Sequence, residues 1–274
     1  MIPEQEPTVK RSTPHDTDAP ILEVSHLTVQ YENHAALDDV SFDLVGGERI
    51  AVVGPNGAGK STLFQVIAGV MEPTAGEVRV AGQCPGGHIC IAYVPQRSQV
   101  DWSFPVTVAD VVMMGRIGQV GLWRRPGRRD RERVHQCLGV VGMDAYADRQ
   151  IGELSGGQQQ RMFIARALAQ EAELVLMDEP LNGLDVAAQE DIFHILSELR
   201  QRQVTVMVAT HDLNMASERF DRVLLLSGRL LGVGRPDVVF VPELLQEAYG
   251  GHLRMVETEG GLMVLSDTCC HGGV

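Results

Sequence analysis

The sequence predicts an α/β fold with a mainly parallel β-sheet, and three observations support this prediction. A glycine-rich loop separates an apolar, strand-like run at residues 49–53 from a helical pattern at 62–68. From residue 155 onward, apolar runs of strand length alternate with helical patterns, which is typical of parallel sheets. The run 174–177 is continuously apolar and ends in two acids, as expected for a buried parallel strand whose carboxyl end faces a ligand.

The bulk composition limits what the chain can be. Its 274 residues suit one large α/β domain, or one domain with an inserted subdomain. The formal net charge of −13 argues against nucleic acid as a partner of the surface as a whole. No apolar run approaches the roughly 18 residues of a membrane span, and the polar N-terminus lacks the apolar core of an export signal. The five scattered cysteines are expected to be free thiols.

The first third of the chain predicts a leader followed by antiparallel strands. Residues 1–20 carry four prolines among polar residues, which predicts a flexible leader. Period-two alternation at 22–31 and 41–44 predicts an early antiparallel β portion. A hairpin-like segment at 76–82 and a strand at 89–94 follow the glycine-rich loop.

The character of the chain changes between residues 97 and 153, where helical patterns cover 106–114 and 130–141. The α/β alternation then returns, with predicted helices and strands at 186–200, 204–209, 213–218, 222–226 and 230–233. Residues 242–274 form a C-terminal extension that is expected to be partly flexible, with a small β element at 256–265.

Two local clusters have alternative interpretations. The basic run from Arg124 to Arg133 could face anionic lipid head groups or an acidic partner, or it could be a solvated helix face. The tripeptide Cys269-Cys270-His271 could hold a metal, but no second ligand pair accompanies it, and a disordered tail is the alternative.

The glycine-rich loop has the G-x-x-x-x-G-K-[ST] pattern of a phosphate-binding loop. Its backbone N–H groups and the positive end of the following helix would surround the phosphates. Lys60 would reach the β- and γ-phosphates, and the Ser61 hydroxyl would ligate Mg²⁺. Apart from Lys10, Lys60 is the only lysine in the chain, so this position requires an ammonium that arginine does not replace. The predicted ATP-binding residues here are Gly54, Pro55, Asn56, Gly57, Ala58, Gly59, Lys60, Ser61 and Thr62.

The two acids after the apolar strand predict metal binding and proton abstraction. Asp178 would hold Mg²⁺ through its water shell, and Glu179 would polarise the attacking water as general base. Gln96 also follows a predicted strand, from which it could reach Mg²⁺ and the attacking water. His211 could hydrogen-bond the γ-phosphate, although a lone histidine is more often structural. Tyr31 could stack on adenine, and an ordinary strand aromatic is the alternative.

The segment Ser155-Gly156-Gly157-Gln158 predicts a second phosphate site. Ser155 and Gln158 form a capping-box pattern at the start of a helix. Two glycines in a first helical turn are costly unless a ligand must approach the backbone. An exposed helix N-terminus offers N–H groups to phosphate. A head-to-tail dimer would therefore pair the loop of one copy with the Ser155 turn of the other, with two ATP molecules between them.

Together these motifs resemble the ATP-binding cassette (ABC) ATPases over residues 22–234. The resemblance implies a P-loop NTPase with a RecA-like core, an antiparallel β subdomain and an inserted helical subdomain at about 97–170, within a domain spanning 21–241. It identifies Gln96 as the Q-loop glutamine and 154–158 as the signature. It also identifies Asn182-Gly183-Leu184-Asp185 as the D-loop, in which Asp185 would help to connect the two sites of a dimer.

The segments 93–108, 111–116 and 121–126 are similar to those of ATPase subunits of bacterial manganese, zinc and iron importers. This likeness implies a multi-span membrane permease as partner, an extracytoplasmic metal-binding protein as an indirect partner, and a location at the cytoplasmic face of the membrane. Haem and siderophore importers have related segments, and the catalytic motifs do not exclude an exporter. A soluble ABC ATPase that acts on DNA is disfavoured by the short, heptad-free stretch between the motifs. A non-catalytic nucleotide-gated regulator is disfavoured by the Asp178-Glu179 pair.

Overall fold

A computed structural model describes residues 20–32, 34–84, 90–121, 124–250, 253–258 and 261–266. The predicted leader, apart from Pro20, and the Cys269-Cys270-His271 tripeptide lie outside these residues. Within the described part of the chain, no helix is both long enough and apolar enough to cross a bilayer.

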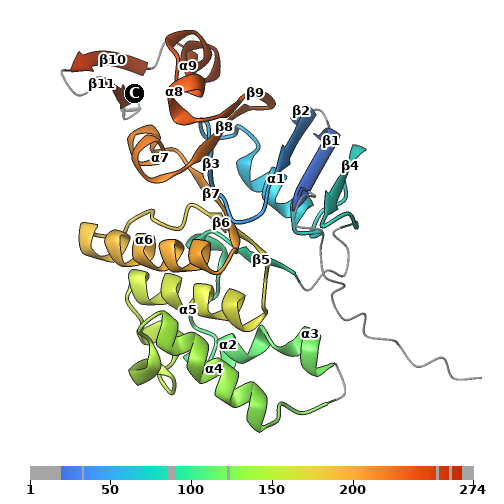
Figure 1. The fold of residues 1–274 in the computed structure, drawn as a ribbon, viewed down its shortest axis with the longest axis vertical. Coiled ribbons are helices and arrows are strands. Elements are labelled where there is room, and N and C mark those ends of the chain that lie inside the picture. Colours follow the sequence, from blue (N-terminus) through green and yellow to red (C-terminus); the bar gives the residue numbers. More distant parts are fainter. Residues whose placement is uncertain are drawn as a thin grey trace, which may run out of the picture.

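A six-stranded sheet forms the centre of the molecule, and all of its neighbouring strands are parallel except the last pair (Figure 1). The predicted mainly parallel sheet is therefore confirmed. Every residue of the second and third strands is buried, which explains why their sequences are almost continuously apolar. In spatial order the strands are β5 (Ile91–Val94), β6 (Leu174–Asp178), β7 (Thr205–Thr210), β3 (Arg49–Val53), β8 (Arg222–Ser227) and β9 (Arg229–Gly234).

A second, antiparallel sheet has the order β2 (His34–Leu44), β1 (Leu22–Tyr31) and β4 (Ala75–Val80). Its apolar face shares one hydrophobic core with the helix α1 (Lys60–Ile67) and with one face of the central sheet. Phe64 and Leu63 of α1 are fully buried in this core. The early antiparallel portion predicted from period-two alternation is therefore present, and it fixes the position of α1.

A group of helices lies at the end of the molecule opposite the antiparallel sheet (Figure 1). The helix α5 (Gly156–Ala169) contacts α2 (Val108–Met114), α4 (Arg128–Val140) and α6 (Val186–Gln201). A short helix, α3 (Ile117–Val120), joins α2 to the segment before α4. The predicted helices at 106–114 and 130–141 are thus present with ends shifted by one or two residues, because Thr107 forms a capping box with Asp110 that starts α2 at residue 108.

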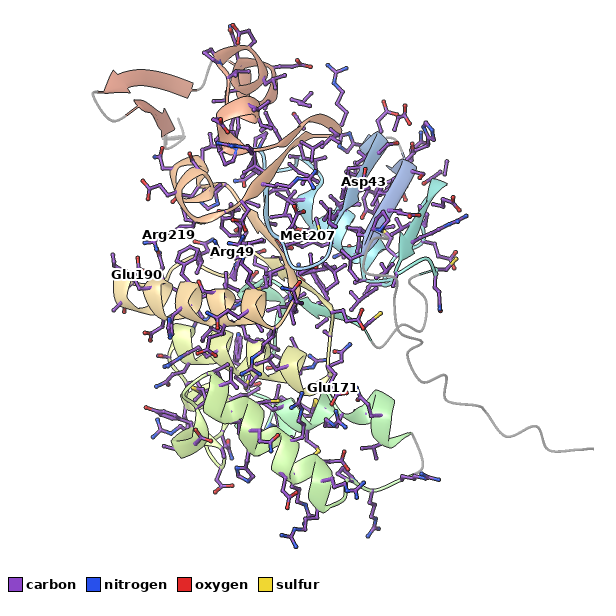
Figure 2. The ribbon with its side chains drawn as sticks, in the orientation of Figure 1. Asp43, Arg49, Glu171, Glu190, Met207 and Arg219 are labelled. Atoms are coloured by element: carbon purple, nitrogen blue, oxygen red, sulfur yellow. The ribbon has the colours of Figure 1, made fainter. Side chains whose placement is uncertain are left out.

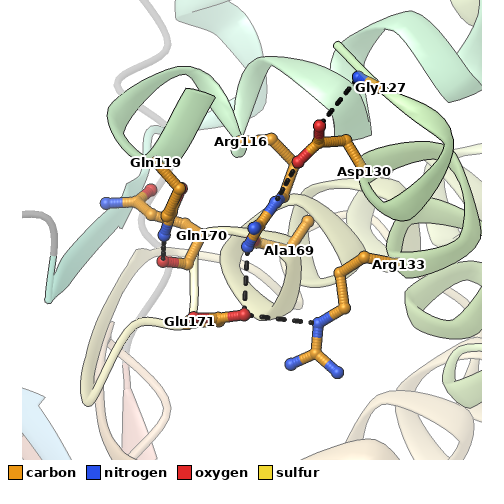
Figure 3. A network of polar contacts seen from close by, with 8 residues as sticks. All are labelled: Arg116, Gln119, Gly127, Asp130, Arg133, Ala169, Gln170 and Glu171. Carbon is orange, nitrogen blue, oxygen red and sulfur yellow. Dashed lines mark hydrogen bonds and ion pairs between the residues drawn. The ribbon is translucent and has the colours of Figure 1, made fainter. Parts of the chain in front are cut away.

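A polar network holds this helical region against the central sheet (Figure 3). Arg116 donates to the carbonyl oxygen of Ala169 at 2.9 Å and to Glu171 at 3.0 Å, and it also contacts Asp130. Gln119 donates to the carbonyl oxygen of Gln170 at 2.6 Å. Because Gln170 in turn donates to the carbonyl oxygen of Ile91 in β5, the network connects α3 and α4 to the strand that leads to residue 96.

The side chains of the basic run at 124–133 lie in two different environments. The Arg128 side chain is 93% exposed and pairs with Glu132. Arg133 is oriented toward Glu171, with an N–O distance of 3.7 Å. One part of the run is therefore a solvated helix face, and another part belongs to the polar network.

The C-terminal part contains two helices that periodicity did not predict, α8 (Pro236–Val239) and α9 (Pro242–Tyr249). Proline stands at the first turn of each, as is common at helix starts. Leu245 and Ala248 of α9 are buried in the main core, so packed structure continues past residue 241. The strands β10 (Leu253–Thr258) and β11 (Gly261–Ser266) pair antiparallel, which confirms the small β element.

The remaining helix, α7 (Leu213–Arg219), connects β7 to β8. Its Arg219 pairs with Glu190 on α6, and the two side chains lie beside each other in Figure 2. Arg49 at the start of β3 contacts Asp221 at 3.5 Å, just before β8. These contacts tie α7 to α6 and the start of β3 to the start of β8.

Candidate nucleotide site

The glycine-rich loop lies between β3 and α1, where two of its glycines have no room for a side chain. A Cβ atom on Gly54 would lie 2.0 Å from the carbonyl oxygen of Leu226, and one on Gly59 would lie 2.5 Å from that of Ala36. Gly59 also has φ +93°, which side chains rarely allow. The loop is therefore held between the end of β8 and the strand β2, with its backbone turned toward the pocket.

Lys60 is buried at the base of this loop, with only 6% of its surface exposed. Its Nζ donates to the carbonyl oxygens of Gly54 at 2.7 Å and Pro55 at 3.0 Å. Burial lowers the pKa of Lys60, and the charges of Glu179 and Asp178 oppose that shift. The desolvated ammonium thus lies near two carboxylates and is held by two carbonyl oxygens at the base of the loop.

Asp178 at the end of β6 is 3% exposed, and its Oδ2 atom has no hydrogen-bond partner among the described residues. Burial raises the pKa of Asp178, and a hydrogen bond from Ser61 opposes this shift. A buried carboxylate oxygen without a partner, next to a hydroxyl oxygen, is a fitting donor set for a hard divalent cation such as Mg²⁺.

Three polar side chains meet at Glu179. Its Oε2 accepts hydrogen bonds from Gln96 Nε2 at 3.3 Å and Asn182 Nδ2 at 3.1 Å. Its Oε1 lies 3.6 Å from His211 Nδ1. The Glu179 side chain is 15% exposed and that of His211 is 57% exposed, so the carboxylate is enclosed while the imidazole faces solvent.

A pocket of about 830 Å³ opens over the loop. Tyr31 lies at its edge with 46% of its surface exposed, and its hydroxyl donates to Met71 Sδ at 3.4 Å. The pocket is large enough for a nucleotide, and it brings together residues from both sheets. Its walls are formed by Tyr31, His34, Ala36, Gln96, Glu179, Asn182, His211, Tyr249 and the loop residues from Pro55 to Thr62.

The Ser155 turn is not part of this pocket's lining. Ser155 caps α5, accepting from Gln158 N at 3.4 Å while Gln158 Oε1 accepts from Ser155 N at 3.0 Å. The structure also shows a packing role for Gly157, which the sequence did not indicate. A Cβ on Gly157 would lie 2.9 Å from the Cβ of Ala188 on α6, so this glycine lets two helices approach closely.

Asp185, the predicted D-loop acid, caps α6 by accepting from Ala188 N at 2.8 Å. Four pocket residues had no individual role assigned from the sequence, namely His34, Ala36, Asn182 and Tyr249, although Asn182 belongs to the predicted D-loop. Asn182 is three residues after Glu179, so its contact with Glu179 could have been predicted from that short spacing. Tyr249 has no local signal, because its position depends on how α9 folds back onto the sheet.

The fold and the site define a P-loop ATPase, because a phosphate loop and an enclosed glutamate line one pocket and a buried carboxylate contacts Ser61 of that loop. Residues 37–182 match the ABC transporter family, and the chain belongs to that family. It is 45% identical over 252 residues to the manganese transport system ATP-binding protein MntB of Halalkalibacterium halodurans, covering 90% of this chain and 99% of that protein.

Two further comparisons agree with this membership. The zinc transport system ATP-binding protein TroB of Treponema pallidum is 48% identical over 233 residues, covering 85% of this chain and 88% of that protein. Among solved structures, a metal-chelate type ABC transporter in an inward-facing conformation superposes with a TM-score of 0.76 at 30% identity, covering 90% of this chain and 96% of that one. The expected architecture, a P-loop core with an antiparallel sheet and a helical region, is confirmed.

Proposed function

We propose that this chain is the ATP-hydrolysing subunit of a transporter that imports a transition metal ion, with manganese, zinc and iron as the candidate ions. The observation that supports it most directly is the convergence of Lys60, Glu179 and His211 on one pocket at the carboxyl ends of neighbouring strands, where the charge of the buried Asp178 also acts on Lys60. The curated relatives named above support the metal-ion class.

In the proposed reaction, Glu179 is the general base. Gln96 and Asn182 hold its Oε2, which leaves Oε1, near His211, to accept a proton from the attacking water. Lys60 exchanges the carbonyl oxygens of Gly54 and Pro55 for phosphate oxygens when ATP enters, because an ammonium binds an anion more strongly than a neutral dipole. Asp178 and Ser61, with Gln96, would hold Mg²⁺, which neutralises charge on the phosphates.

The second phosphate site requires a second copy of the chain. The Ser155 turn carries a helix N-terminus with no acidic residue in its first turn, and it does not line the pocket of its own chain. We infer that two copies assemble head to tail, so that each Ser155 turn, with Gly156, Gly157 and Gln158, closes over the ATP of the other. Asp185, which caps the start of α6, would help to connect the two sites of this dimer.

Closure of this dimer would drive a multi-span permease at the cytoplasmic face of the membrane, with a metal-binding protein on the far side supplying the ion. Tyr31 would stack on the adenine from the edge of the pocket. Hydrolysis would then reopen the dimer and reset the permease.

Substitution of Glu179 tests the catalytic assignment. Glu179→Gln keeps the size and hydrogen-bonding capacity of the side chain but removes its basicity, so we expect ATP affinity to persist while turnover falls by at least about 100-fold. Turnover is measured by phosphate release and affinity by titration with nucleotide. Brisk hydrolysis by this variant would refute the general-base role.

Metal uptake tests the transport assignment. Cells that lack the chain are compared for accumulation of manganese, zinc and iron, with complementation by the parent and by Lys60→Ala. We expect uptake of one of the three metals to depend on the parent and to fail with Lys60→Ala. Unchanged uptake of all three metals would exclude the proposed cargo, and co-purification with a multi-span membrane protein would then separate another transporter from a soluble ATPase.

A further inference from the structure

The C-terminal helix α9 contributes one side chain to the nucleotide pocket. Tyr249, the last residue of α9, lines the pocket together with Lys60 and His211, although 189 and 38 positions of sequence separate it from them. The rest of the helix is anchored in the core, because Leu245 is fully buried and Ala248 is 6% exposed. The place of Tyr249 at the pocket is therefore fixed by packing rather than by a loop.

The same end of α9 is hydrogen-bonded to the structure that supports the phosphate loop. Ser227 Oγ at the end of β8 donates to the carbonyl oxygen of Ala248 at 3.3 Å. The next residue, Gly228, donates its N–H to the carbonyl oxygen of Ala58 in the phosphate loop at 3.0 Å. Two hydrogen bonds, made by the consecutive residues Ser227 and Gly228, thus connect α9 to the phosphate loop.

The segment after Tyr249 reaches the other side of the site. The strand β10 contacts α9, and β11 contacts α7, the helix that begins two residues after His211. The strands β10 and β11 therefore contact α9, which is linked to the phosphate loop, and α7, which begins near His211. A change at Tyr249 can be transmitted to either of them through packed structure.

The hydroxyl of Tyr249 is buried and has no hydrogen-bond partner among the described residues. Burial raises the pKa of this hydroxyl, so it remains a neutral donor at physiological pH. A buried hydroxyl without a partner is destabilising, and the cost is removed when an acceptor becomes available. The acceptors that enter this pocket are the oxygens of the nucleotide.

We propose that Tyr249 is a nucleotide-binding residue whose hydroxyl donates to a phosphate oxygen of ATP, and that α9 thereby reports the loaded state of the pocket to the C-terminal segment. This inference rests on the proposed ATPase function, since it requires nucleotide in this pocket. Because the side chain packs against the main core and its hydroxyl is buried, the side chain must turn toward the cavity to make this contact. Loss of the contact weakens ATP binding and releases α9 from its dependence on nucleotide.

The test uses the full chain carrying Glu179→Gln, so that ATP is not consumed. ATP affinity is measured by calorimetric titration for this parent, for Tyr249→Phe, for Lys60→Ala and for Tyr146→Phe. Tyr146 is a matched control because its ring contacts Arg149 in the helical region and does not line the pocket. We expect Tyr249→Phe to raise the Kd about tenfold, the loss expected for one hydrogen bond to a charged group, and Tyr146→Phe to leave it unchanged.

Thermal stability provides an independent test of the Tyr249 contact. Without nucleotide, Tyr249→Phe removes an unsatisfied hydroxyl and so does not lower Tm, which shows that the variant folds. With Mg-ATP, its Tm rises less than that of the parent because its affinity is lower. Hydrogen exchange completes the test: Mg-ATP protects the amides of 243–249 in the parent and protects them less in Tyr249→Phe.

The outcomes separate this inference from the proposed function. Equal ATP affinity in the parent and in Tyr249→Phe, with weak binding by Lys60→Ala, would overturn the role of Tyr249 and leave the ATPase assignment intact. Unchanged affinity in Lys60→Ala would overturn the pocket assignment, and the role of Tyr249 with it.

Discussion

Replacement of Gly157 by alanine tests why two glycines follow Ser155. A Cβ at Gly157 would lie 2.9 Å from the Cβ of Ala188 on α6, whereas carbon atoms in contact are about 3.5–4.0 Å apart. A Cβ at Gly156 would meet only the ends of two long side chains, Arg97 and Leu184, both at 3.0 Å. The two glycines therefore have different surroundings, although they stand next to each other in the same sequence motif.

The expected magnitudes follow from these neighbours. Overpacking costs about 1–3 kcal/mol and alanine recovers about 1 kcal/mol of helix propensity, so Gly157→Ala should lower the free energy of unfolding by about 0–2 kcal/mol. Ala188→Gly alone should cost about 1 kcal/mol. In the double variant the clash is absent, so the two substitutions should couple by about 1–3 kcal/mol. Gly156→Ala should change stability by less than about 0.5 kcal/mol, since flexible side chains can move aside.

Urea denaturation of the four proteins, followed by circular dichroism, measures this coupling. If the effects of Gly157→Ala and Ala188→Gly add within about 0.5 kcal/mol, the helix contact does not explain the glycine and the packing argument is wrong. ATP hydrolysis by Gly156→Ala addresses the other role. Loss of turnover without loss of stability would indicate that this glycine serves the phosphate of a second copy.

Three further predictions follow from the site and its supports. The raised pKa of Asp178 means that the folded state holds its proton more tightly, so without ligands this contribution to stability is full below pH 3.8 and is lost as the pH rises through the raised value. Asp178→Asn should remove that decline in a pH series of Tm while abolishing hydrolysis, and an identical series for both proteins would contradict the reasoning. Gly54→Ala should cost at least about 3 kcal/mol by denaturation, because its Cβ would lie 2.0 Å from the Leu226 carbonyl oxygen. Arg116→Ala should cost about 2–3 kcal/mol in the same assay, since it leaves Asp130 and Glu171 without their shared partner, whereas the exposed Arg128→Ala should be nearly neutral; equal losses would count against the network.

The phosphate loop and the end of β6 were predictable because their chemistry is local. A glycine-rich loop between strand and helix, and an apolar run that ends in two acids, each specify a backbone path and a ligand type within ten residues. The capping residues Thr107 and Ser155 are local in the same sense. The helix α9 was not predicted, because its eight residues are too few for periodicity to separate a helix from a loop.

What the sequence determined by itself is the kind of chemistry: one lysine in a phosphate loop, an Asp-Glu pair, and an alternating pattern that makes a mainly parallel sheet. Only the tertiary structure decided which residues meet. The convergence of Gln96 and His211 on Glu179, the packing of Gly157 on Ala188, and the place of Tyr249 in the pocket join positions far apart in the chain. Such contacts depend on strand order and helix packing, which short-range patterns do not encode.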